Sequence, residues 1–395
     1  MAFFNKVSRL VQGKTRKHGF KYEGFVGTRA GLTFNLVGTN HQQNSRTTSI
    51  AVDDIAGIKI AYANFYLVGN VETNNGAAST VTAAVEYPSG VFTQIPFYKG
   101  NPTGTVAAGG VLFSEYASVA IPKGATFWIR MFINNANGVF YNIWDNGAGG
   151  DLIHSAASGL SDLTMGGTIS DDGTFSSPPF AIIGMTSKAS VLLLGSSVIR
   201  GFNDTGTISD FRMGMIAKSF PNDLAFVNLS GDAAAGSTWV ANTAGRKLLY
   251  TYASHAIFEL TAVDLINGNS AASVEAQLAT LYQLFGPRVL KTQMTAWPSS
   301  ASSSNSFIDA AGQTAASYNA ARVTLNTGLR AGPIPFLNNG IYEVAWVLEE
   351  SHDSGKWVFD GTANKYTSDG IHPTVAGYDL IVSSGAIDTA RLHYP

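Results

Sequence analysis

Val191-Leu-Leu-Leu-Gly-Ser-Ser-Val-Ile-Arg-Gly201 is the stretch that decides the fold expected for the second half of the chain. Its first four residues form an apolar run that is typical of a buried strand, and Gly195 ends that run. A serine at the sharp exit of such a strand presents its hydroxyl above the edge of the sheet, where free backbone N–H groups can stabilise an oxyanion. Taken alone, Gly-Ser-Ser after a strand is also typical of an ordinary turn.

Short apolar runs alternate with helix-like stretches from Ala189 onward. The further runs are Leu224–Leu229, Ala256–Leu260, Val289–Met294 and Ile341–Leu348. The helix-like stretches are Ser209–Phe220, Thr238–Tyr252, Ala271–Phe285, Ile308–Leu329 and Thr374–Leu392. This alternation predicts a parallel five-stranded, doubly wound sheet in residues 188–395. In such sheets, functional sites gather at the carboxyl ends of the strands.

Residues 25–187 have the pattern of an all-β domain. Phe127–Ile133 alternates in the period of a strand, with aromatic residues in both sets, so this strand should be covered on both faces. Val81–Val85 and Val91–Phe97, joined by a turn at Pro88–Gly90, predict a hairpin. Many short strands with polar turns favour a β-sandwich, jelly-roll-like in its architecture.

The N-terminal segment, residues 1–24, is basic and amphipathic. Its Lys and Arg residues are Lys6, Arg9, Lys14, Arg16, Lys17 and Lys21. Its apolar residues with helical spacing are Phe3, Phe4, Val7, Leu10 and Val11. We expect this stripe to pack on the chain itself or on a partner subunit, so that the segment and the β domain support a homo-oligomer or a larger assembly. Contact with a membrane surface or polyanion, and a frayed tail, are the alternatives.

Composition narrows the classes of function. With 395 residues the chain should form about two domains. A net charge of −2 provides no basic field for nucleic acid, and the absence of cysteine excludes disulfides and thiolate metal sites. We see no metal-ligand spacing of histidines and no nucleotide-binding glycine motif, so no metal and no cofactor are expected. No apolar run is long enough to span a membrane and no secretory signal is evident, which favours a cytoplasmic or virion-associated protein.

The second informative stretch is Ser368-Asp-Gly-Ile-His-Pro-Thr374. Asp369 and His372 are three residues apart on one expected loop, just before a helix that Pro373 suits as a first residue. On such a loop the carboxylate can fix the tautomer and orientation of the imidazole while the other ring nitrogen faces a serine. Alone, this string could equally be a helix-capping turn.

Together the two stretches resemble the SGNH (GDSL-like) hydrolase family. The family's first block, Gly-Asp-Ser, corresponds to Gly195, Ser196 and Ser197, and its last block, Asp-x-x-His-Pro, corresponds to Asp369 and His372. The resemblance covers roughly residues 188–395. It implies a flavodoxin-like three-layer α/β/α domain in which Ser197 is the nucleophile, His372 the base and Asp369 its partner. Because a serine replaces the family's acid at 196, a smaller possibility is that Ser196 attacks.

The family's second block, which supplies a backbone N–H to the oxyanion hole, is similar to residues 227–238. We expect Gly236 to be this donor, because Gly-Ser-Thr at a helix start resembles the family's Gly-Asp-Thr. Gly231 is the alternative.

The family's third block, Gly-x-Asn-Asp, is altered in this chain. Thr261 stands in place of its glycine and Val263 in place of its asparagine. Valine cannot donate a hydrogen bond, so the side-chain donor of the oxyanion hole is absent at its expected place. Losing one such donor typically costs about 10²–10³ in rate. Asn267 or Asn269 could reach in from the same loop, or two backbone donors could suffice.

The function that the resemblance implies is ester hydrolysis through an acyl-enzyme. A β-sandwich joined to such a domain is similar to esterases that remove acetyl groups from polysaccharides, so an acylated polysaccharide is the expected substrate. The alternative is a structural or binding component of a particle, such as a phage tail or capsid decoration protein. In that case the hydrolase-like domain would act on host surface glycans or be catalytically degenerate.

Overall fold

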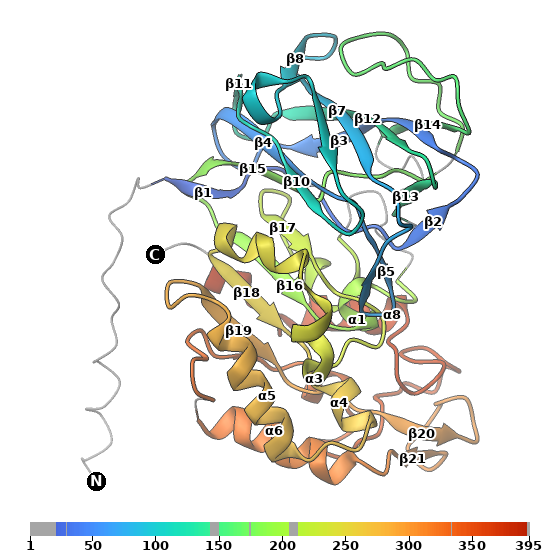
Figure 1. Ribbon diagram of the computed structural model, residues 1–395. Helices are drawn as coiled ribbons and strands as arrows, with labels where there is room; N and C mark the ends of the chain where they lie inside the picture. Colours follow the sequence, from blue (N-terminus) through green and yellow to red (C-terminus); the bar gives the residue numbers. More distant parts are fainter. Residues whose placement is uncertain are drawn as a thin grey trace.

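The computed structural model describes residues 21–28, 30–142, 150–173, 175–204, 212–332 and 334–392. It combines an antiparallel β region with a region of parallel strands and helices (Figure 1). The predicted apolar stripe Phe3–Val11 lies outside the described residues. Strand β1 (Tyr22–Phe25) begins within the stretch that we assigned to the N-terminal segment, because it pairs with β15 (Ala181–Thr186).

The β region holds two larger antiparallel sheets. One runs in the order β1, β15, β4 (Ile55–Ala63) and β10 (Val111–Phe113), and β11 (Ala117–Ile121) also pairs with β4. The other runs in the order β14 (Leu152–Ala156), β3 (Gln42–Ile50), β12 (Thr126–Asn135), β7 (Ser79–Glu86) and β8 (Phe92–Ile95), and β9 (Thr103–Val106) also pairs with β7. Smaller ladders join β2 (Asn35–Val37) to β13 (Val139–Tyr141) and β5 (Tyr66–Val68) to β6 (Val71–Thr73).

The alternation in β12 has the consequence expected from the sequence. Ile129 and Ile133 are buried in a core cluster that also holds Ile58 and Ile60 of β4. The opposite face is covered too, because the buried Arg130 donates hydrogen bonds to two backbone carbonyls of the 163–167 loop. The hairpin of β7 and β8 is confirmed by its antiparallel pairing.

The second half of the chain contains the predicted parallel five-stranded sheet. Its order is β17 (Ala225–Asn228), β16 (Ser190–Leu194), β18 (His255–Phe258), β19 (Leu290–Met294) and β22 (Ile341–Tyr342), and every pair is parallel. β16, the first of these strands in the chain, is near the centre of the sheet. The turn after it therefore lies at the carboxyl edge, between the neighbouring strands β17 and β18.

The helices of this half contribute to two core clusters. They are α1 (Ser197–Arg200), α2 (Gly214–Ala217), α3 (Gly236–Trp239), α4 (Ala262–Ile266), α5 (Ala271–Gln283), α6 (Asn319–Ala331), α7 (Ala345–Leu348) and α8 (Val375–Ser384), with 3₁₀ turns at Val240–Asn242, Arg246–Tyr252 and Thr389–Leu392. A further 3₁₀ turn, Tyr98–Gly100, lies in the β region. Leu192 and Leu194 pack in one core cluster with residues of α5 and α6. Val191 and Leu193 pack in a second cluster with residues of α1, α2 and α8. Alternate residues of β16 thus pack in two separate core clusters.

Four predicted elements differ from the structure. The run Ile341–Leu348 is a strand only at its start, because Thr295 Oγ1 accepts the N–H groups of Val344 and Ala345 and the chain turns into α7. The first part of the stretch Ile308–Leu329 is not helical: it contains β21 (Gln313–Ala315), which pairs with β20 (Ser300–Ser303), before α6 starts.

The stretch Thr238–Tyr252 is a broken series of short helices rather than one helix. The Glu72 carboxylate accepts the N–H groups of Gly245 and Arg246, so these donors leave the helical pattern. Only Gly214–Ala217 is helical in the described part of Ser209–Phe220.

The two halves are joined by buried polar contacts near the carboxyl edge of the parallel sheet. Arg246, fully buried, donates to Asn70 and Glu72 in the β5–β6 hairpin. Gly31 forms a bridge with Asn228 at the end of β17. No helix among the described residues is long and apolar enough to cross a membrane.

Candidate active site

Ser197 is the first residue of α1, directly after the turn that ends β16. The turn requires glycine at 195, because a Cβ there would lie 2.4 Å from Ile199 Cγ1 and 2.8 Å from Glu259 Oε2. Gly201, with a φ of +94°, closes the short helix in the left-handed region that favours glycine. The Gly-x₅-Gly pattern therefore corresponds to a tight strand–turn–helix that holds Ser197 at the carboxyl edge.

The structure brings Ser197, His372 and Asp369 together. Ser197 Oγ lies 2.9 Å from His372 Nε2, and His372 Nδ1 lies 2.7 Å from Asp369 Oδ2. Both distances are within hydrogen-bond range for a nucleophile, a base and the group that orients the base. Residues 175 positions apart in the chain thus form one hydrogen-bonded series.

The electrostatics fix the tautomer of His372. Partial burial opposes ionisation of Asp369, but hydrogen bonds from the His372 ring and from the N–H groups of His372 and Ile371 outweigh it and lower its pKa to about 2. An ionised carboxylate only accepts hydrogen bonds, so Nδ1 carries the proton. Nε2 is then left to accept the Ser197 hydroxyl proton.

Two tryptophans hold the loop that carries Asp369 and His372. Trp297 Nε1 donates to the Ile371 carbonyl at 2.9 Å, and Trp357 Nε1 donates to the Gly370 carbonyl at 2.8 Å. Both indoles are buried. Their role could not be read from the sequence, because both partners are backbone atoms distant in the chain.

The site faces solvent and carries an aromatic ring at its mouth. The side chains of His372 and Asp369 are 20% and 40% exposed. Phe202 lies with its ring centroid 4.6 Å from that of His372 and is itself partly exposed. Close by, Arg200 on α1 forms an ion pair of 2.8 Å with Asp232.

Ser196 is placed away from the base. It is buried, and its N–H donates to Glu259 Oε2 at 2.6 Å. Sequence reasoning did not identify Glu259 as part of this region. The available signal was an acidic residue at the end of an otherwise apolar run, Ala256–Leu260.

Gly236 is engaged differently from the oxyanion role expected for it. Its N–H donates to Asp264 Oδ2 at 2.5 Å, and the neighbouring Ser237 N–H donates to Oδ1 at 3.3 Å. The buried carboxylate thus caps the start of α3, since free N–H groups at a helix N-terminus favour an anionic acceptor. The alternative, Gly231, donates its N–H to the Gly195 carbonyl at 3.2 Å. In this arrangement neither donor is available to a substrate.

The third block contributes no evident side-chain donor. Val263 is half-buried, and Thr261 Oγ1 donates to the Glu259 carbonyl. Asn269 Nδ2 is directed to Asp264 Oδ1 at 3.4 Å, while Asn267 is exposed at the end of α4. Within the part of the chain that the structure describes, the N–H of Ser197 has no hydrogen-bond acceptor.

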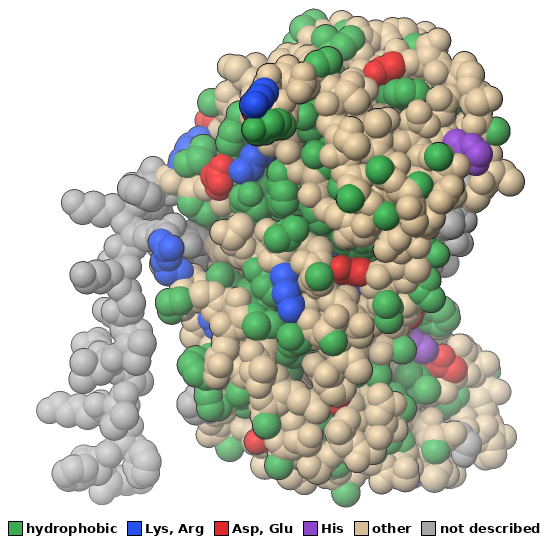
Figure 2. Space-filling model, viewed as in Figure 1, with side chains coloured by type: hydrophobic (Ala, Val, Ile, Leu, Met, Phe, Trp, Pro, Cys, Tyr) green, Lys and Arg blue, Asp and Glu red, His purple; other side chains and the backbone are tan. Residues whose placement is uncertain are grey.

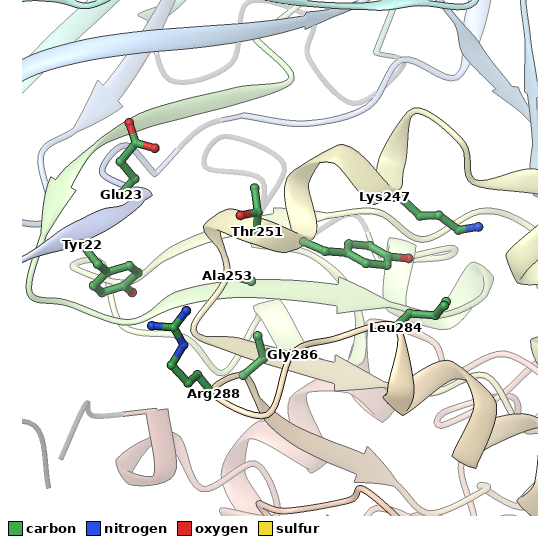
Figure 3. Close-up of a pocket in the computed structure, with 10 residues that line it drawn as sticks. Tyr22, Glu23, Lys247, Thr251, Ala253, Leu284, Gly286 and Arg288 are labelled. Carbon is green, nitrogen blue, oxygen red and sulfur yellow. The ribbon is translucent and has the colours of Figure 1, made fainter. Parts of the chain in front are cut away.

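The remaining histidines and acids form no metal centre in the described ranges, where no group of three or more potential ligands is close enough to hold an ion. A pocket of about 720 Å³ lies elsewhere (Figure 3). It is lined by Ala253 and Val289, which precede β18 and β19, and by Tyr22 of β1. It therefore opens at the amino edge of the sheet, opposite Ser197.

Comparison with known proteins gives distant matches in structure only. No family model matches the chain, and neither does any curated protein. A peptidoglycan O-acetylesterase structure is 13% identical, covering 96% of this chain and 79% of its own, with a TM-score of 0.40. A member of the lipolytic G-D-S-L family from Veillonella parvula (17%, 51% and 98%, TM-score 0.36) and a lipase/acylhydrolase from Enterococcus faecalis (14%, 52% and 98%, TM-score 0.36) are also similar.

The chain resembles GDSL-like hydrolases.

Proposed function

We propose that the protein is a carboxylic ester hydrolase with Ser197 as its nucleophile. The observation that carries this proposal is the series Ser197 Oγ, His372 and Asp369, with separations of 2.9 and 2.7 Å. Such a series activates a hydroxyl that is otherwise a weak nucleophile.

The reaction proceeds in two halves. His372 Nε2 takes the Ser197 hydroxyl proton as Oγ bonds to the ester carbonyl carbon. The tetrahedral intermediate then expels the alcohol, which receives that proton, and leaves an acyl-enzyme. Water attacks the acyl carbon, gives a proton to His372, and the acid departs as Ser197 regains its hydrogen. Asp369 stays ionised and balances the charge of the imidazolium.

The oxyanion is stabilised first by the Ser197 N–H, which has no acceptor among the described residues. For Gly236 to join it, Asp264 would have to release the Gly236 N–H. We therefore infer an enzyme with fewer preset donors than its resemblance implies, and a modest turnover rate.

We further propose an acetylated carbohydrate as substrate. A partly exposed triad suits a bulky polymeric alcohol, and the partly exposed Phe202 ring beside His372 offers an apolar surface for a sugar ring. The proposal includes the finer fold assignment: a jelly-roll-like β-sandwich in residues 25–187, and a flavodoxin-like α/β/α domain in 188–395. The observed strand order, with β16 between β17 and β18, supports the latter.

The test is active-site labelling followed by substrate comparison. A fluorophosphonate probe should label wild type and fail to label Ser197→Ala, while Ser196→Ala keeps labelling. Acetate release from an acetylated polysaccharide should exceed release of longer acyl groups from matched esters. A folded wild type that resists the probe would contradict the esterase proposal.

A further inference from the structure

Glu259 lies beneath the nucleophile turn. It follows β18 directly, is fully buried, and accepts the Ser196 N–H with Oε2 at 2.6 Å. The same oxygen would lie 2.8 Å from a Cβ at Gly195. Its carboxyl therefore touches both residues that precede Ser197.

The surroundings of Glu259 disfavour its ionised form. Oε1 is buried and has no hydrogen-bond partner in the described part of the chain. Burial raises the pKa of Glu259 to about 7; hydrogen bonds from Ser196 and the Ala262 N–H offset this in part, and the Asp264 charge adds to it. The titratable groups that interact electrostatically with Glu259 are Asp264 on α4 and Tyr378 on α8, and neither is a cation.

A simple structural acceptor for the Ser196 N–H would not need a carboxyl. A buried backbone carbonyl or an amide would accept that hydrogen bond without the cost of burying an ionisable group. Glu259 Oε2 accepts the N–H of Ser196, the residue directly before Ser197, so a charge on this carboxyl would lie near the Ser197 N–H. A negative charge there opposes the oxyanion that forms on the substrate, whereas a neutral carboxyl still accepts from Ser196.

We propose that Glu259 is a positioning residue of the esterase reaction; this inference rests on the proposed function. The neutral carboxyl of Glu259 fixes the Gly195–Ser197 turn, and its ionisation slows acyl transfer. The wild-type rate should therefore fall as the pH rises and Glu259 ionises. Ionised Glu259 should lower kcat by about 10- to 100-fold.

The experiment compares the pH dependence of kcat and KM for wild type, Glu259→Gln and Glu259→Leu, using p-nitrophenyl acetate. Glutamine keeps a neutral acceptor, so its kcat should match wild type at pH 6.5 and stay high at pH 9, where wild type declines. Leucine removes the acceptor and should lower kcat about 10²-fold at all pH values with KM little changed. Gln293→Leu, a matched loss of a buried polar group on the neighbouring β19, should keep the wild-type profile.

Thermal unfolding of each variant shows which are folded, and the glutamine profile tests the proposal even if the leucine variant does not fold. An alkaline decline of kcat in Glu259→Gln equal to that of wild type overturns the inference. So does a leucine variant with unchanged kcat. If wild type itself is not labelled at Ser197 by a fluorophosphonate, the esterase proposal fails; if it is labelled and the Glu259 profiles do not differ, only the role of Glu259 fails.

Discussion

Ser197, His372 and Asp369 could be predicted from the sequence because two short motifs lie at opposite ends of a predicted α/β region. Each motif alone is ambiguous, but the pair in this order is specific. The backbone donors could not be predicted, because their availability depends on which acceptor lies nearby. Gly236 illustrates this limit: its N–H is held by Asp264, a residue 28 positions later. The contact of Glu259 with the nucleophile turn could not be predicted for the same reason, since its partner Ser196 is 63 positions earlier.

The altered third block gives a prediction at this scale. Asn269 is directed to Asp264 and Asn267 is exposed, so neither amide is placed by a hydrogen bond toward Ser197. We expect Asn267→Ala and Asn269→Ala to keep kcat within about threefold of wild type, because neither removes an oxyanion donor. Val263→Asn should raise kcat by supplying an amide. Steady-state kinetics decide: a loss of about 10²-fold in either alanine variant would identify a third donor.

Glu259 also makes a prediction about stability. Its pKa is raised from 4.5 to about 7 in the folded state, so the folded protein holds this proton more tightly than the unfolded chain. The resulting stabilisation is fully present below about pH 4.5 and is lost as pH rises through about 7, at about 1.4 kcal/mol per unit of pKa difference. Between pH 5 and 8.5 the free energy of unfolding should fall by roughly 3 kcal/mol more in wild type than in Glu259→Gln.

Urea denaturation at the two pH values measures this difference. The opposite shift at Asp369, whose pKa falls to about 2, adds stability that is lost only as pH drops below about 4, outside this window. Equal pH dependence in wild type and Glu259→Gln would mean that Glu259 is not neutral in the folded protein.

Secondary-structure elements were predicted correctly where the pattern of apolar residues alone determines the element. The five parallel strands follow from short, largely apolar runs whose residues are mostly buried. Prediction failed where a single polar side chain redirects the backbone: Thr295 ends β22 early, and Glu72 breaks the helix expected over Thr238–Tyr252. Such contacts join residues that are distant in the chain, so no local sequence pattern predicts them.

The Asp369–His372 loop is an element whose rigidity can be tested. Trp297→Phe and Trp357→Phe each remove one N–H donor and leave a carbonyl of the loop without that hydrogen bond, at a cost of about 1–3 kcal/mol. Because the loop orients His372, kcat should fall about tenfold or more with little change in KM. Trp346→Phe is the matched control, since Trp346 is partly exposed and stacks on His352. Kinetics of Trp297→Phe and Trp357→Phe that match this control would show that the indoles only fill space.

The whole molecule has a weakly charged surface and a core that continues through both halves. On the face shown in Figure 2, charged side chains are few and scattered, as a charged content of 13% implies. One hydrophobic cluster contains Ile60 of the β region as well as Leu192 and Leu278 of the α/β region. The two halves are therefore packed against each other through a shared core. This packing places Gly31 beside Asn228, at the carboxyl edge of the parallel sheet.

Among the described residues, two ion pairs cross between the halves, and they differ sharply in burial. Arg246 with Glu72 is buried, at 0% and 11% side-chain exposure, while Lys123 with Asp223 is exposed, at 43% and 57%. Arg246→Met leaves the Glu72 carboxylate without its cation and should lower the free energy of unfolding by about 3–5 kcal/mol. Lys123→Met should change it by less than about 1 kcal/mol, because water already screens that pair.

The same pair of variants tests whether the halves unfold as one unit. Wild type should show a single cooperative transition by both calorimetry and tryptophan fluorescence, since the shared core couples the two regions. Loss of the Arg246 contacts to Asn70 and Glu72 should separate this into two transitions, because those contacts tie the β5–β6 hairpin to the helical region. Lys123→Met should keep one transition. A single transition in Arg246→Met, at an unchanged midpoint, would show that the apolar core alone couples the halves and that the buried arginine is dispensable.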